Sequence, residues 1–217
     1  MTLLELKQLL STLLADSSSN FYTEGERLQA LNNGCAYINS ELRLLRTVAT
    51  ITITPIDNGK VPLPIDFVSM GQGVTWDEVG GQSTALNRLN VLQLQDRNAT
   101  WSSDTGTPQS YVMEGSNLYL YPAPNRAGVL NLSYVAMPNK LVHDTDVPFY
   151  DDVRTQSYHE CIAFYAAWLL TLKDRDFEAA QQFMGYFQSR LVDLKENLRH
   201  TGDVSVQPVW SDTYSVV

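Results

Sequence analysis

The stretch that decides the fold is residues 106–146, which reads GTPQSYVMEGSNLYLYPAPNRAGVLNLSYVAMPNKLVHDTD. It holds three short runs in which apolar and aromatic residues alternate with polar ones, as in a strand with one buried face. Clusters of Gly, Pro and Asn separate the runs and are typical of turns. Upstream, residues 61–67 add a proline-containing entry to the same β region. The sequence therefore predicts an antiparallel sheet or a small sandwich.

The residues upstream of this stretch are less regular. Residues 47–54 alternate threonine with alanine and isoleucine, which predicts a half-buried strand. Asp57-Asn58-Gly59 predicts a turn, because Asn and Gly tolerate positive φ. Three further segments are assigned from their patterns: a strand at 74–79, a strand or a short helix at 86–96, and a polar loop at 97–108.

Helical patterns flank the β region on both sides. Leucines at three- and four-residue steps predict a helix over residues 3–14, and Thr23 with Glu26 forms the capping box of a second helix. The apolar positions of the second helix are Leu28, Leu31, Cys35, Ile38, Leu42 and Leu45. Two more helices are predicted after residue 151. Their apolar faces are Tyr158, Cys161, Ile162, Tyr165, Trp168, Leu169 and Leu172, and then Ala180, Phe183, Phe187, Leu191, Leu194 and Leu198.

The order of these elements predicts an α+β fold. Neither helix pair buries its apolar stripe alone, so the N- and C-terminal pairs are expected to pack together as one helical bundle. The antiparallel β domain is then an insertion in that bundle. The expected domains are 1–46 with 150–200 for the bundle, 47–149 for the inserted β domain and its connecting loop, and 201–217 for an extended C-terminal docking tail.

Composition restricts the possible partners. The chain has 15 basic and 24 acidic residues and a formal net charge of −9, whereas tight binding to DNA requires clustered Lys and Arg. An acidic surface is compatible with DNA that slides past without specific binding. No apolar run is long enough to span a membrane. The N-terminal residues place charges within their leucine pattern, so they are not expected to act as a secretory signal. The chain is therefore expected to be made and kept in the cytoplasm of the producing cell.

The motifs that could carry chemistry are incomplete. His159-Glu160 lacks the second histidine of a zinc protease, because position 163 is alanine. Gly71-Gln72-Gly73 lacks the third glycine of a dinucleotide loop and favours a flexible turn. Asp151-Asp152 suits a helix start better than an acid/base pair. The sequence therefore predicts no catalytic residue, no cofactor and no metal site, and indicates that the chain is not an enzyme.

Two groups of residues leave alternatives open. Cys35 and Cys161 lie within apolar helical patterns, so buried free thiols are favoured over a disulfide or a catalytic thiol. Tyr119, Tyr121 and Tyr134 could stack on nucleic-acid bases, but no Lys or Arg alternates with them before Arg126. Packing in a core or an interface is the favoured role for these tyrosines.

Five short motifs together resemble the head–tail adaptor proteins of tailed bacteriophages, and the resemblance covers roughly residues 20 to 200. Pro64 and Pro122 stop strand continuation, and Gly106 permits a turn, so the motifs are structural. They are Leu63-Pro64-x-Asp66-Phe67, Gly106-x-Pro108-x-x-Tyr111, Tyr121-Pro122-Ala123-Pro124, Leu132-x-Tyr134 and Leu141-x-x-Asp144.

The resemblance implies a structural protein of the virion. In that family a helical-bundle adaptor with a β domain forms a homo-oligomeric, dodecameric ring at the head–tail junction. The ring docks beneath the portal protein, extends the DNA channel and receives the next tail or nozzle component. DNA would pass without specific binding, and no membrane would be involved. The alternatives are another ring-forming virion or tail-completion protein, and a hydrolase or other enzyme with an unrecognised site.

The C-terminal tail differs in composition from the rest of the chain. Residues 203–217 contain two aspartates, no Lys or Arg, and apolar residues separated by small polar ones. Such a segment is expected to be loose in isolation. Exposed aromatic residues favour burial by a partner. The partner-docking residues are therefore predicted to be Val209, Trp210 and Tyr214, and the portal is the expected receiver.

Overall fold

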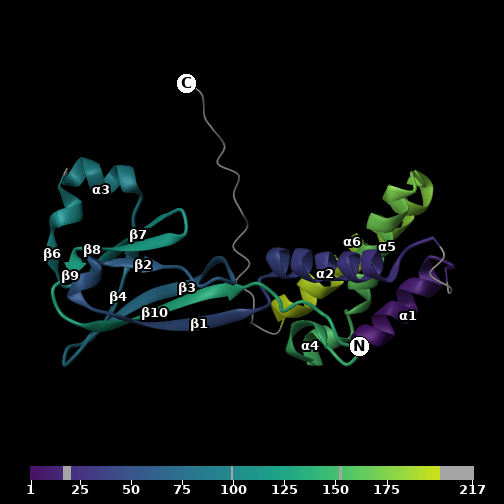
Figure 1. The fold of residues 1–217 in the computed structure, drawn as a ribbon, viewed down its shortest axis with the longest axis horizontal. Coiled ribbons are helices and arrows are strands. Elements are labelled where there is room, and N and C mark those ends of the chain that lie inside the picture. Colours follow the sequence, from purple (N-terminus) through teal and green to yellow (C-terminus); the bar gives the residue numbers. More distant parts are fainter. Residues whose placement is uncertain (17–20, 99, 152, 201–217) are drawn as a thin grey trace, which may run out of the picture. The chain divides into compact units, whose positions relative to one another are not determined.

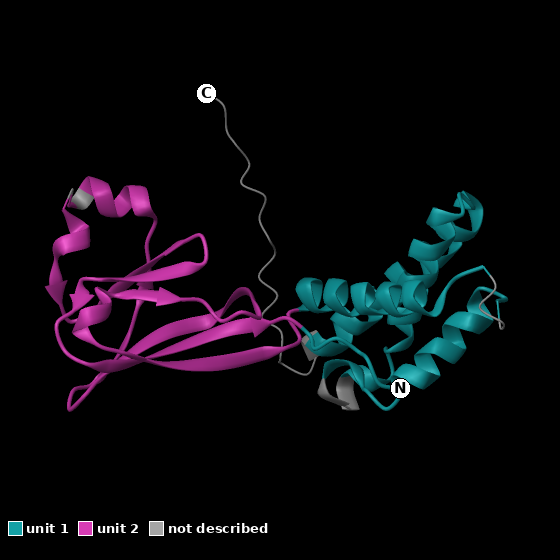
Figure 2. Ribbon diagram, viewed as in Figure 1, with its two compact units in different colours: residues 1–42, 138–217 teal, residues 43–137 magenta. Residues whose placement is uncertain are grey.

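The structure is a computed structural model that describes residues 1–16, 21–98, 100–151 and 153–200. The chain forms two compact units (Figure 2). Unit 1 consists of residues 1–42 together with the chain from residue 138 onward, and unit 2 consists of residues 43–137. Along the sequence, helices precede and follow a β region (Figure 1). The predicted α+β class, with helices flanking an inserted β region, is confirmed.

Unit 1 is built around one central helix. Helix α5 contacts α1, α2 and α6, so it is covered by helices from both ends of the sequence. The approach to α2 is close: a Cβ atom on Gly34 would lie 3.1 Å from the carbonyl oxygen of Ile162. The elements of unit 1 are α1 (Leu3–Leu13), α2 (Glu24–Leu42), the 3-10 helix η3 (Pro148–Asp151), α4 (Val153–Gln156), α5 (Glu160–Lys173) and α6 (Phe177–His200).

The buried face of α5 differs from the predicted one. The prediction followed the large apolar residues, yet Tyr165 and Trp168 are only half-buried. The fully buried positions include Ala163, Ala166 and Ala167. Three neighbouring helices can approach one helix closely only where its side chains are small, so alanines occupy the crowded side of α5. Ile162 and Leu170 are the large aliphatic residues that are buried with them.

A buried ion pair connects α1, the loop that follows it, and α2. The Arg27 guanidinium donates from Nη2 to Oδ2 of Asp16 at 2.7 Å and to the Asp16 carbonyl oxygen at 2.6 Å. Its Nη1 donates to the hydroxyl of Ser11 at 2.6 Å. Both charged side chains are almost fully buried. The periodic pattern of α2 gave no sign of this pair, because it tracks apolar residues only.

The predicted capping box at the start of α2 is present. The Thr23 hydroxyl accepts from the backbone N–H of Glu26 at 3.3 Å, and the Glu26 carboxylate accepts from the N–H of Thr23 at 3.0 Å. The other carboxylate oxygen pairs with the Lys173 ammonium at the end of α5. The bond from Lys173, followed by those from Thr23, lowers the pKa of Glu26 from 4.5 to about 2.

Unit 2 contains two four-stranded sheets, with strand orders β1-β10-β3-β4 and β2-β8-β7-β5. All their pairings are antiparallel except β5 with β7, and β6 pairs with β9 in a separate parallel ribbon. The elements of unit 2 are β1 (Arg46–Ile53), η1 (Pro55–Asp57), β2 (Lys60–Pro62), β3 (Phe67–Glu78), β4 (Ser83–Ala85), β5 (Asn87–Arg88), α3 (Val91–Arg97), η2 (Trp101–Ser103), β6 (Thr105–Gly106), β7 (Ser110–Glu114), β8 (Asn117–Tyr121), β9 (Ala123–Pro124) and β10 (Gly128–Ala136).

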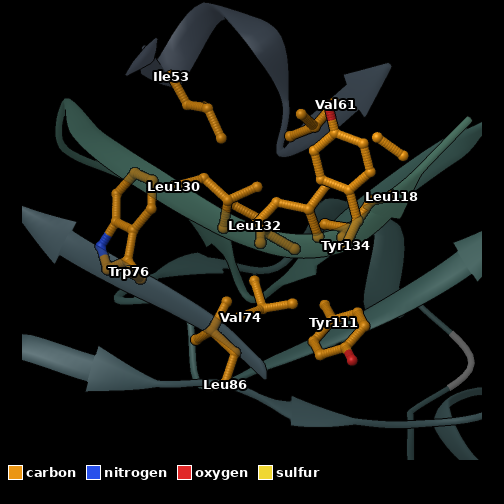
Figure 3. Packing of buried hydrophobic residues seen from close by; sticks show 12 residues of the cluster. Ile53, Val61, Val74, Trp76, Leu86, Tyr111, Leu118, Leu130, Leu132 and Tyr134 are labelled. Carbon is orange, nitrogen blue, oxygen red and sulfur yellow. The ribbon is translucent and has the colours of Figure 1, made fainter. Parts of the chain in front are cut away.

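Apolar side chains from both sheets form the core of unit 2 (Figure 3). Trp76 and Leu130 come from the first sheet, and Leu118 comes from the second; all three are at most 1% exposed. A Cβ atom on Gly128 would lie 2.3 Å from the Trp76 ring and 2.8 Å from the Asp77 carbonyl oxygen. The indole therefore packs directly on the backbone of β10, which only glycine permits at this point.

Several segments of unit 2 differ from their predictions. The ambiguous residues 86–96 contain both possibilities, the short strand β5 and then α3. Gly71-Gln72-Gly73 is not a flexible turn but part of β3. The register of β3 against β10 shifts there, and the Gln72 N–H donates to the Ser133 hydroxyl at 3.2 Å. The glycines therefore accommodate a bulge in a strand.

The connection from unit 2 back to α4 belongs to unit 1, although the sequence assigned residues up to 149 to the β domain. The Asn32 side chain donates to the carbonyl of Leu141 at 3.1 Å and accepts from its N–H at 2.8 Å. The Leu3 N–H donates to the carbonyl of Asp146 at 2.8 Å. These bonds attach the connection to α1 and α2, which no local pattern revealed.

Replacing Arg27 by alanine should destabilise unit 1 strongly. The substitution leaves the buried Asp16 carboxylate without its cation, which costs about 3 kcal/mol. Urea denaturation followed by helical circular dichroism measures the loss. Lys7→Ala is the matched control, because Lys7 pairs with the exposed carboxylates of Glu24 and Asp144 and such pairs contribute less than about 1 kcal/mol. Equal losses in the two variants would contradict the importance of the buried pair.

Adding one methyl group at position 128 should destabilise unit 2. In Gly128→Ala the Trp76 ring must move, and overpacking of this kind costs about 2 kcal/mol. In Gly73→Ala the new methyl group meets no atom within 4 Å, so the free energy of unfolding should change by less than about 0.5 kcal/mol. Chemical denaturation of both variants measures the difference. Wild-type stability of Gly128→Ala would disprove the close contact.

The Glu26 interactions should make stability fall with acidification. The pKa of Glu26 is lowered in the folded chain, so its contribution is complete above about pH 4.5 and is lost as pH falls toward about 2. Glu26→Gln removes this titration, and its Tm should change less than that of the wild type across the same interval. Thermal melts at several pH values measure both curves. Parallel curves for the two proteins would refute the assignment.

Candidate partner-docking site

The predicted docking residues Val209, Trp210 and Tyr214 lie outside the described residues. The described part of the chain ends with α6 at His200, in unit 1. The docking segment is therefore a continuation of the helical unit in sequence, and its role remains a prediction.

The candidate chemical groups of unit 1 are packed in its interior. His159 is 1% exposed, its Nδ1 lies 3.1 Å from the Met1 amino nitrogen, and its ring contacts Phe149 edge to face. Cys35 and Cys161 are free and buried, as predicted, and burial raises the pKa of each thiol to about 12. Such thiols stay protonated at neutral pH and are poor nucleophiles. Within the described ranges, no group of three His, Cys, Asp or Glu residues is placed to hold a metal.

The three tyrosines of the β region do not form one stacking platform. Tyr134 is buried on β10 and its hydroxyl donates to Asp66 at 2.9 Å. Tyr121 is on β8, in the other sheet, and its hydroxyl donates to Asp104 at 3.2 Å. Tyr119 packs edge to face on Trp101. All three rings therefore have packing roles, as the sequence favoured.

A pocket of about 270 Å³ opens in unit 2 beside Lys60, Trp101 and Tyr119. Asp57 also lines it, but the Asp57 carboxylate accepts bonds of 2.8 Å from both the N–H and the hydroxyl of Thr54. These bonds, the backbone one first, lower the pKa of Asp57. A carboxylate engaged in this way caps the turn η1 and is a poor general base. The pocket provides shape and aromatic surface without an activated group.

The negative charge is concentrated in one part of the chain. Unit 2 holds seven acidic and six basic residues, so seventeen of the 24 acidic residues and nine of the 15 basic residues lie in the rest of the chain. The helical segments and the C-terminal tail therefore supply nearly all of the net charge of −9. Neither unit has the excess of Lys and Arg that phosphate binding requires.

Sequence reasoning missed an open edge in the first sheet of unit 2. Strand β1 is at the end of the order β1-β10-β3-β4, and β10 is its one hydrogen-bonded neighbour among the described strands. The Ala136 N–H donates to the Leu45 carbonyl at 2.8 Å, and these residues are opposite each other in the register that β1 and β10 share. In an antiparallel pair, every second residue of a strand directs its backbone N–H and carbonyl groups toward the neighbouring strand, and the residues between them direct theirs away. The bond at Leu45 therefore fixes which β1 residues face β10.

The outward-facing backbone groups of β1 belong to Val48, Thr50 and Thr52. Their side chains are exposed, and Val48 is 60% exposed. We call these three residues the β1 edge. Natural edge strands usually carry lysine, proline or a bulge that blocks further pairing, whereas residues 47–54 contain none of them. The absence of these blocking residues was the available signal, but alternation alone does not tell an edge strand from a central one.

The family model for SU10 adaptor proteins matches residues 1–209. This chain belongs to the SU10 adaptor protein family. The match covers all the described residues and ends at Val209, the first of the three predicted docking residues. No curated protein matches the chain.

Membership confirms the resemblance to phage head–tail adaptors. The protein is therefore a structural component of a phage virion with a role in tail assembly. Adaptors of this kind interact with portal and tail proteins, so its partners are proteins of the virion. No helix in the described ranges is long and apolar enough to cross a bilayer. The packed chemical groups described above agree with a structural role.

Proposed function

We propose that this adaptor forms a ring, dodecameric as in the proteins it resembles, at the head–tail junction. The ring docks beneath the portal, extends the DNA channel and receives the next tail or nozzle component. The observation that carries the proposal is the family match over residues 1–209. The protein acts by docking and conduction, without bond-making chemistry.

A ring beneath a cyclic portal requires a head-to-tail interface. Such an interface joins two different surfaces of identical copies, and it closes when the rotation between copies divides a full turn evenly. An interface that uses the same patch on both copies would stop at a dimer. We therefore propose that neighbouring copies contact one another through two different surfaces, with the portal as a template for closure.

The tail 201–217 is proposed to hold the ring on its neighbour. Val209, Trp210 and Tyr214 would fill apolar sites on the portal, because aromatic anchors usually supply most of the binding energy in such contacts. Ordering a free segment costs entropy, so each single contact is expected to be weak. Many copies in one ring raise the total affinity.

Assembly on the portal tests the proposed function. Mixing the protein with the portal of its own phage should give a complex whose native mass corresponds to one ring of adaptor copies per portal. Deleting residues 203–217 should abolish this complex and shift Tm by less than about 2 °C, because the proposed role of these residues is to bind the portal and not to complete the helical unit. A protein that stays monomeric with its portal would overturn the adaptor ring. Full docking by the truncated protein would remove the tail from the mechanism.

DNA should pass through the assembled ring without binding tightly to the protein. With a net charge of −9 and no basic excess in either unit, the protein should show no sub-micromolar affinity for duplex DNA at about 0.15 M salt. Fluorescence anisotropy of a labelled duplex, titrated with protein at several salt concentrations, measures this. A tight affinity that weakens steeply with salt would show a basic surface and contradict the proposed channel.

A further inference from the structure

The β1 edge is a side of a sheet that can accept one more strand. Val48, Thr50 and Thr52 direct their N–H and carbonyl groups away from β10, the neighbour of β1 among the described strands. Such an edge is a template for strand addition, and any extended segment can supply the main-chain bonds. The partner strand must therefore be identified from its length, its side chains and its charges.

Within the described part of the chain, the strand that fits this edge best is β1 of a second copy. The other edges of the two sheets of unit 2 are blocked or short. Strand β2 contains Lys60 and Pro62, β4 and β5 have three and two residues, and the part of β3 that β4 leaves open contains a shift of register. Lysine, proline and bulges all oppose further pairing. Strand β1 has eight residues and none of these features.

An antiparallel pair centred on Thr50 uses the whole β1 edge. In this register Thr50 lies opposite the partner's Thr50, and Val48 lies opposite the partner's Thr52. Residues with outward backbone groups then meet one another, so each of these pairs exchanges two N–H···O bonds. The arrangement is symmetric, and the same edge serves both copies.

The same register brings together the core residues that β1 leaves incompletely covered. Ala49 and Ile51 pack against the core of unit 2 but are only half-buried, whereas Ile53 is 2% exposed. With Thr50 at the centre, Ala49 lies opposite the partner's Ile51, so a small side chain meets a large one. These positions are the non-hydrogen-bonded ones, where side chains are closest. Pairing would therefore continue the apolar core from one copy into the next.

Charge favours an antiparallel pair over a parallel one. Arg43 and Arg46 stand at the beginning of β1, and Asp57 follows its end, in η1. Residues 47–56 between them carry no charge. Antiparallel copies bring the basic beginning of one strand toward the acidic end of the other. Parallel copies in register would place the arginines of the two copies side by side, and like charges directly opposite destabilise a strand pair.

We propose that free copies of the adaptor pair through their β1 edges, in an antiparallel dimer centred on Thr50. One strand pair buries little surface, so the dimer is weak and reversible. Because the same patch serves both copies, the contact closes at two copies and cannot extend into a ring. The dimer protects an edge that would otherwise aggregate, and it keeps β1 occupied until the copies separate. It does not depend on the proposed ring, so the two proposals can fail separately.

Opposite charges at position 50 test the pairing with the adaptor alone. Sedimentation equilibrium of the wild type should show a monomer–dimer equilibrium with a dissociation constant below about 1 mM. In Thr50→Lys two ammonium groups face each other, and in Thr50→Glu two carboxylates do, so each constant should rise about fivefold or more. An equimolar mixture of the two variants should form a mixed dimer as tight as that of the wild type. Thr105→Lys, exposed on β6, is the control and should leave the constant unchanged.

A disulfide at position 50 tests the register. The Cα atoms of a hydrogen-bonded antiparallel pair are about 5.5 Å apart, which a disulfide can bridge. Thr50→Cys should therefore give a cross-linked dimer on mild oxidation, whereas Thr105→Cys should stay monomeric under the same conditions. The native Cys35 and Cys161 are buried and do not compete.

Three results would overturn the proposal. The first is a wild-type protein that stays monomeric up to about 1 mM. The second is a dimer that both charge variants retain, or a mixture of the variants that pairs no more tightly than either alone. The third is cross-linking of Thr105→Cys as readily as of Thr50→Cys. None of these measurements contains the portal, so each result leaves the proposed ring to its own test.

Discussion

The helical unit depends on contact between the two ends of the sequence. Helix α5 buries alanines against α1 and α2, and α6 covers it from the C-terminal side. In proteins most of the stability of a helix comes from the packing of its apolar face, and α1 and α5, with 11 and 14 residues, are short enough to be marginal in water when isolated. The chain must therefore return from unit 2 before unit 1 can form. Contacts so distant in sequence slow folding, because the loop between them closes at an entropic cost.

Much of this fold follows from local patterns. The capping box of Thr23 and Glu26, the alternation in β1 and the four long helices were predicted from spacing alone, because each depends on neighbours within a few residues. Features that depend on distant residues were missed. The small face of α5 is set by three other helices, and the Arg27–Asp16 pair needs a loop that brings a carboxylate back onto α2. The bulge at Gly71–Gly73 likewise depends on the register of β10.

The candidate site likewise combines a feature that local sequence predicts with one that depends on distant residues. The tail was recognised from composition, since aromatic residues in a charge-poor segment suggest a partner. The family provides the biological setting, a structural role in a phage virion. The β1 edge required the register, because a half-buried strand has the same sequence pattern whether one neighbour or two are present. One backbone bond, from Ala136 to Leu45, decides which residues face outward. The sequence of β1 alone does not show which of its residues face outward.

The chain crosses between its two units at two points, near residues 42 and 137. On the return side, Asn32 and Leu3 hold the connection at Leu141 and Asp146 by bonds within unit 1. The helical unit thus fixes the return end of its own insertion, whatever that insertion contains. In evolution, a β region of different length or strand number could be exchanged at these two points without rebuilding the helices. Adaptors for different tails could in this way diversify one module while conserving the other.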